Sequence, residues 1–160
     1  MKNNHKYFLI FVLCSLLTFG SSKSNEPFIF DVTEIEILND GNQINGYKGG
    51  TAISEDGSKI VAENFFYNKL TNILEATGNV EYIDQLKDTI ITSDKATYLK
   101  NDEKIFTVGN SKAFDKNSSI TAKSLEYDKA NNIFEATGNV EYIDQLKDTI
   151  ITSDKATYLK

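Results

Sequence analysis

The sequence has few of the residues that most often carry chemistry. Its 160 residues include no arginine and no tryptophan, and only one cysteine, one histidine, one proline and one methionine. Cys14 and His5 both lie in the first fourteen residues, in a segment with the features of an export signal. Once that segment is removed, no thiol or imidazole remains. Disulfide frameworks, zinc sites built on cysteine or histidine, thiol catalysis and Ser-His triads are therefore excluded.

The charge balance is acidic. The chain has 23 aspartates and glutamates against 17 lysines, a net charge of −6. Removal of residues 1–22 takes away Lys2 and Lys6, leaving 15 lysines against 23 acids, or −8. Nucleic-acid binding relies on basic patches that release phosphate counterions. An acidic chain without arginine therefore argues against a nucleic-acid partner.

The first 22 residues have the layout of a signal peptide. Lys2 and Lys6 precede an apolar run from Tyr7 to Phe19, which is followed by Gly20 and two serines. A run of about thirteen residues is typical of a signal peptide and short for a membrane span. The alternative is an uncleaved N-terminal anchor. In both cases the rest of the chain is predicted to work outside the cytoplasm.

Two kinds of repeat follow. Residues 75–100 recur unchanged at 135–160, an identity over 26 residues that indicates a very recent duplication or an artefact of sequence assembly. An older repeat of about 30 residues underlies it, with apolar or small residues at offsets 0, 2, 5 and 7. Its members are Phe30, Val32, Ile35, Ile37; Ile60, Ala62, Phe65, Tyr67; Ile91, Ser93, Ala96, Tyr98; Ile120, Ala122, Leu125, Tyr127; and Ile151, Ser153, Ala156, Tyr158.

These offsets predict bent β-strands. Steps of two place side chains on one face of a strand, and the central step of three requires a bulge or bend, at Lys95 or Lys123 for example. A glycine eleven residues after the tyrosine, as at Gly78, Gly109 and Gly138, permits a second bend. Each unit is then two bent strands and two turns. Residues 81–90 also allow a helix, but their β-branched run favours a strand.

The repeated phrase resembles that of the OstA-like family, which includes periplasmic lipopolysaccharide-transport proteins of the LptA type and the N-terminal domain of the assembly protein LptD. Ala62-Glu63 leads to Tyr67 and then to Ala76-Thr77-Gly78-Asn79-Val80. The phrase recurs from Ala122-Lys123 to Tyr127 with residues 136–140, and more loosely from Ser93 to Asn110. The resemblance covers about residues 27–160.

The resemblance implies an all-β fold: an open, bent antiparallel β-jellyroll of stacked 30-residue, two-strand repeats. It implies that an apolar groove holds the acyl chains of lipid A, and that edge strands pair head to tail with other jellyroll proteins of a transport bridge or with a second copy. It places the protein in the periplasm, in association with the outer membrane if it is of the LptD type. The predicted lipid-facing set is Phe30, Ile35, Ile37, Ile60, Phe65, Tyr67, Leu74, Ile91, Tyr98, Ile120, Leu125, Tyr127 and Phe134.

Other interpretations stay open at this stage. The lipid-facing set also fits a plain core, as in a structural β-solenoid or a surface or adhesin segment. The small residues between the large ones either leave room for a chain or lie where two walls converge. The carboxylates, Asp84 among them, are expected on solvated faces, so no enzyme, metal or cofactor is predicted. Residues 27–160 supply about four and a half units, so an LptA-like chain and an incomplete, LptD-like fragment both fit.

Overall fold

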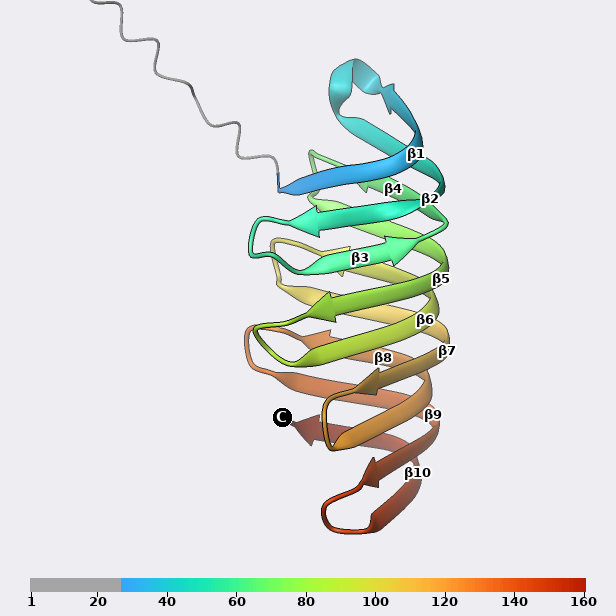
Figure 1. Ribbon diagram of the computed structural model, residues 1–160, viewed down its shortest axis with the longest axis vertical. Coiled ribbons are helices and arrows are strands. Elements are labelled where there is room, and N and C mark those ends of the chain that lie inside the picture. Colours follow the sequence, from blue (N-terminus) through green and yellow to red (C-terminus); the bar gives the residue numbers. More distant parts are fainter. Residues whose placement is uncertain (1–26) are drawn as a thin grey trace, which may run out of the picture.

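The computed structural model describes residues 27–160, and the predicted signal peptide over residues 1–22 lies outside them. The strands form one antiparallel sheet in the order β1-β2-β3-β5-β6-β7-β8-β9-β10, with β4 pairing β2 and β5 (Figure 1). The elements are β1 (Phe28–Leu38), the 3-10 turn η1 (Asn39–Gly41), β2 (Gln43–Ser54), β3 (Lys59–Ala62), β4 (Asn64–Asn68), β5 (Ile73–Asp84), β6 (Thr89–Leu99), β7 (Lys104–Phe114), β8 (Ser118–Asp128), β9 (Ile133–Asp144) and β10 (Thr149–Leu159).

Each long strand bends near its middle. The register of the β5–β6 pair shifts between Thr77 and Val80, and Gly78 and Asn79 there have φ angles of +81° and +47°. Glycine and asparagine adopt this left-handed conformation at the lowest cost. The same Gly-Asn pair lies at 109–110 and 138–139, again with positive φ. The predicted bends and the all-β jellyroll are therefore confirmed.

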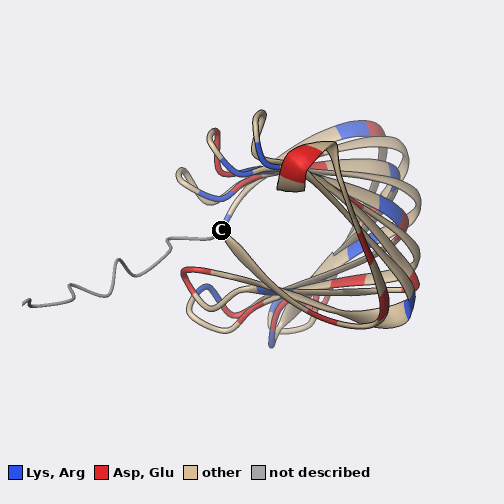
Figure 2. Ribbon diagram, turned by 90° about the horizontal axis from the view of Figure 1, so that it is seen from above, with Lys and Arg blue, Asp and Glu red and all other residues tan. Residues whose placement is uncertain are grey.

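The bends fold the sheet into two walls. Wall 1 contains the strand halves that end in the turns at 55–58, 85–88, 115–117 and 145–148, which we call turn row 1. Wall 2 contains the halves that end in η1 and the turns at 69–72, 100–103 and 129–132, which we call turn row 2. Seen along the stack in Figure 2, the bends lie on one side and the two turn rows face each other on the other side. We call this facing edge the mouth.

The space between the walls contains one apolar core. Alanines lie beside the bends, including Ala76, Ala96, Ala122 and Ala136, and all are buried. The larger aromatic residues lie nearer the mouth, with Tyr67, Tyr82, Tyr98 and Tyr127 fully buried. Small side chains thus line the interior beside the bends.

Residues 81–90 are strand and turn rather than helix, because β5 ends at Asp84 and β6 begins at Thr89. This agrees with the β-branched run in the sequence. Over residues 27–160 there is no helix with the length and apolar character needed to span a membrane.

Candidate functional site

The thirteen predicted lipid-facing residues fall into three groups. Phe30 is half-buried and packs against the core. Ile35 and Ile37 are 53% and 61% exposed. The other ten are almost fully buried: Ile60, Phe65, Tyr67, Leu74, Ile91, Tyr98, Ile120, Leu125, Tyr127 and Phe134.

Ile35 and Ile37 are exposed although they belong to the inner face. They pair across the β1–β2 ladder with Gly46 and Ile44. Directly opposed residues of an antiparallel pair point to the same side of the sheet, and Ile44 packs against the core. The inner face is therefore uncovered at β1, the first strand of the stack. Ile151 of β10 is likewise 52% exposed, opposite the half-buried Tyr142.

Between these ends the two walls touch. Ring centroids of Tyr82 on wall 1 and Tyr98 on wall 2 lie 6.4 Å apart, and Tyr82 is also 6.4 Å from Tyr127. Nearer β1, the rings of Phe30 and Phe65 approach to 6.0 Å with an edge-to-face geometry. Such aromatic contacts add to the stability gained from burial alone. A long apolar ligand would reach this part of the interior only if the walls separate.

Each turn of turn row 1 has an aspartate in it or directly before it. The Oδ1 atoms of Asp56, Asp84, Asp115 and Asp144 each accept a backbone N–H from the same turn, at 2.9 to 3.1 Å. A carboxylate that accepts a nearby backbone N–H is a common way to hold such a turn. The second oxygen, Oδ2, is left to face other partners.

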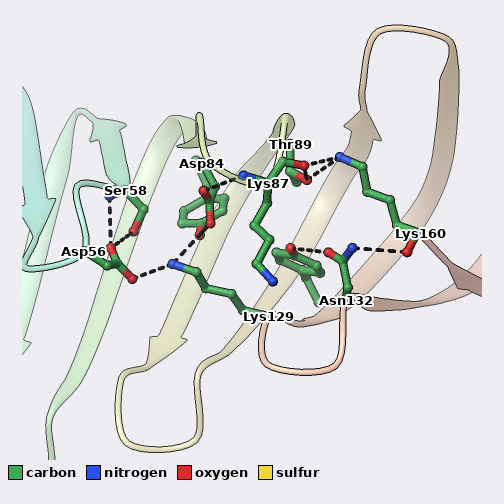
Figure 3. A network of polar contacts seen from close by, with 10 residues as sticks. Asp56, Ser58, Asp84, Lys87, Thr89, Lys129, Asn132 and Lys160 are labelled. Atoms are coloured by element: carbon green, nitrogen blue, oxygen red, sulfur yellow. Dashed lines mark hydrogen bonds and ion pairs between the residues drawn. The ribbon is translucent and has the colours of Figure 1, made fainter.

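Lys129 in turn row 2 reaches across the mouth to two of these aspartates (Figure 3). Its ammonium donates to Oδ2 of Asp56 and lies 3.1 Å from Oδ2 of Asp84. The Lys129 and Asp84 side chains are 9% and 3% exposed. The same Asp84 oxygen accepts the hydroxyl of Tyr82 at 3.3 Å. The contact joins strands that are not neighbours in the sheet.

A second lysine makes a similar crossing. Lys160, which follows β10, donates to the backbone carbonyls of Lys87 and Asp88 and to the Thr89 hydroxyl at 2.8 Å. It also lies 3.9 Å from Asp115. Asn132 of turn row 2 donates to the Lys160 carbonyl (Figure 3).

The charges at Lys129 are stable over a wide pH range. Burial alone would raise the pKa of Asp56, but hydrogen bonds from Lys129 and Ser58 outweigh it and hold the pKa well below its usual range. Burial alone would lower the pKa of Lys129, but hydrogen bonds to Asp56 and Asp84 raise it above its usual value. Burial raises the pKa of Tyr82 and Tyr98, so these phenols stay neutral.

The expectation that Asp84 lies on a solvated face is wrong. It is buried at the mouth, where Lys129, 45 residues later in the sequence, pairs with it. One sequence signal marks the lysines: each tyrosine at the last repeat position is followed two residues later by a lysine, at 69, 100, 129 and 160.

The described part of the chain contains no group of three or more histidine, cysteine or acidic residues placed to bind a metal ion.

Comparison with known proteins identifies the family. The model of the OstA-like protein family matches residues 29–159. The chain belongs to the OstA-like family. This OstA-like chain also resembles the crystal structure of LptH from Pseudomonas aeruginosa, the LptA-homologous periplasmic component of the lipopolysaccharide transport device, with a TM-score of 0.66. The identity is 12% over 74% of this chain and 95% of LptH, so the likeness concerns the fold. A comparison with curated proteins gave no significant match.

Proposed function

We propose that this OstA-like protein is a lipopolysaccharide-transport module that holds lipid A acyl chains against its inner face. The observation that carries the proposal is a continuous apolar inner face that, within residues 27–160, is uncovered on β1, at Ile35 and Ile37. Burial of roughly ten methylenes would contribute about 8 kcal/mol at ~0.8 kcal/mol each. Family membership and the LptH-like fold support a carrier rather than an enzyme.

The proposal includes an exported protein and edge-strand partners. The segment 1–22 directs the chain out of the cytoplasm, and the LptH likeness supports the periplasm as its location. Within residues 27–160, β1 and β10 are the outer strands of the sheet. Unpaired strand edges favour pairing with another chain, so we expect β1 and β10 to contact other jellyroll proteins or a second copy. Such contacts would continue the inner face from one protein to the next.

A lipid-binding measurement tests the proposal. The double substitution Ile35→Glu with Ile37→Glu places two charges on the uncovered inner face, where burial against acyl chains is costly. Ile29→Glu is the matched control, because Ile29 is an exposed residue of the same strand beside the inward Phe28. We expect lipopolysaccharide to displace a bound fluorescent lipid from the purified wild-type protein and from the control. The double variant should bind lipopolysaccharide at least ~10-fold more weakly.

The structural alternative makes a different prediction. A β-solenoid or adhesin segment would self-assemble through β1 and β10 without affinity for lipid. Sedimentation of the purified protein with and without lipopolysaccharide separates the two. Fibres that form while no lipid co-sediments would contradict the transport proposal.

A further inference from the structure

The ion pairs at the mouth join parts of the chain that the sheet itself does not connect. Lys129 follows β8, whereas Asp56 precedes β3 and Asp84 ends β5, so the contacts span several strands as well as the two walls. The pair at 84 and 129 and the pair at 115 and 160 have the same separation of 45 residues. The crossing therefore repeats with the sequence unit. In both cases a lysine at the wall 2 end of a strand lies opposite an aspartate in or beside turn row 1.

These contacts are built to be stronger than surface ion pairs. Exposed pairs contribute little, because water and salt screen them. Lys129 and Asp84 are almost fully buried, and Asp56 and Asp84 each keep a backbone N–H on Oδ1. Figure 3 shows the Lys129 ammonium between the two carboxylates. An attraction in such a water-poor setting resists separation of the turn rows.

Two buried hydroxyl groups beneath the crossing have incomplete hydrogen bonding in the closed arrangement. The hydroxyls of Ser54 on wall 1 and Tyr98 on wall 2 are both buried near each other, but within residues 27–160 neither makes a hydrogen bond of ordinary length and angle. Buried polar atoms of this kind cost free energy that hydration would return. Closure at this point therefore depends on other contacts, and Asp56, which pairs with Lys129, lies in the turn that directly follows Ser54.

We propose that Lys129, with Asp56 and Asp84, is a latch that holds the two turn rows together and must release before a lipid chain can pass sideways through the mouth into the interior. The entry route rests on the proposed lipid function, whereas the closing role of the latch does not. Lys160 with Thr89 forms the equivalent closure nearer β10.

A latch-free variant tests the closing role. Asp56→Asn, Asp84→Asn and Lys129→Met together remove the charges, while the asparagine oxygens keep the turn hydrogen bonds. Lys104→Met with Glu126→Gln is the matched control, because this 2.6 Å ion pair joins the adjacent strands β7 and β8 and does not cross the mouth. Lys129→Arg keeps the positive charge and should behave as the wild type.

The first measurement is the distance between the turn rows. Leu70 and Leu86 are exposed residues of opposite rows, and Leu70→Cys with Leu86→Cys in a Cys14→Ser background carries two spin labels. Pulsed electron paramagnetic resonance should give one short distance between the two labels for the wild type, the control and Lys129→Arg. For the latch-free variant the distribution of distances should be longer and broader. An unchanged distribution in the latch-free variant would overturn the latch.

The second measurement is the rate of lipopolysaccharide uptake, followed by displacement of a fluorescent lipid. We expect uptake at least ~10-fold faster in the latch-free variant, equivalent to ~1.4 kcal/mol. Leu70→Cys with Leu86→Cys leaves Lys129 and both aspartates in place. When a cleavable bis-maleimide linker joins the two cysteines after folding, uptake should slow at least ~10-fold until the linker is cut. This second variant keeps the test decisive if the latch-free protein folds poorly.

The outcomes separate the two proposals. If the wild type binds lipid and the latch-free variant takes up lipopolysaccharide at the same rate, the latch is not an entry gate. The transport function would then still stand. Widened distances in a protein that binds no lipid would support the closing role and reject the transport function.

Discussion

Two regions of this protein have the same sequence and different surroundings. Residues 75–100 form most of β5 and β6 and the turn between them, and residues 135–160 form the matching parts of β9 and β10. Ile91 is 1% exposed in the first copy, and its counterpart Ile151 is 52% exposed. Tyr98 is fully buried, whereas Tyr158 is only partly buried.

The difference comes from the neighbours alone. β6 lies between β5 and β7, whereas β10 pairs only with β9 among the strands of residues 27–160. At the mouth, Asp84 of the first copy is covered by Lys129, whereas Asp144 pairs with the exposed Lys147 of its own turn. Turn and bend geometry is local and repeats in both copies, but burial and cross-mouth pairing depend on the units stacked on either side.

The largest expected contrast concerns the lysines that pair with the two equivalent aspartates. Lys129→Met leaves Asp84 buried without its partner and should lower the free energy of unfolding by about 3–5 kcal/mol. Lys147→Met removes an exposed lysine and should cost less than about 1 kcal/mol. Urea unfolding measures both. Equal costs would mean that the Lys129 crossing contributes no more than a surface pair.

The next contrast concerns the equivalent isoleucines. Ile91→Ala creates a cavity in the core and should cost about 2–5 kcal/mol. Ile151→Ala truncates a side chain that is half exposed and should cost less than about 1 kcal/mol. Urea midpoints of the two variants check this. A cost for Ile151→Ala as large as that for Ile91→Ala would show that β10 is covered in solution, as by a second copy.

The glycines at the bends should contribute equally to stability in the two copies. Gly78 and Gly138 have φ angles of +81° and +82°, and a Cβ would lie 2.8 Å from the Glu63 Cβ or 2.9 Å from the Lys123 Cδ. Gly78→Ala and Gly138→Ala should therefore destabilise the protein by similar amounts, about 1–2 kcal/mol each. Thermal unfolding compares them. A several-fold difference would contradict the local origin of the bend.

The smallest effect is the pH dependence of the latch. The lowered pKa of Asp56 gives stability that is present above its unfolded pKa of about 3.9 and is lost as pH falls further. The raised pKa of Lys129 gives stability that is present below about pH 10.4 and is lost as pH rises above it. We expect the free energy of unfolding to fall at both limits.

Unfolding titrations of the wild type and the latch-free variant test this pH dependence. The wild-type free energy should fall at both limits by more than that of the variant. Identical pH profiles would mean that the latch groups do not titrate with folding.

The sequence predicts the local features because a short pattern determines them. The offsets 0, 2, 5 and 7 predicted the strands and bends, and the Gly-Asn pairs marked where the register shifts. The mouth was not predictable in this way. Asp84 and Asp144 have identical flanking residues, so no local pattern reveals that Lys129 pairs with Asp84 and not with Asp144. That contact follows from the twist and stacking of whole units, as does the exposure of Ile35.

Photo-crosslinking in cells tests the central claim, contact of lipid with the inner face, most directly. A benzophenone amino acid at Phe65 or Tyr127 lies on the inner face, and the same group at the exposed Phe66 next in sequence points outward as the control. The account predicts crosslinks to lipopolysaccharide from positions 65 and 127 and none from position 66. Folded protein with no crosslink at either inner position, or with equal crosslinking at position 66, would contradict it.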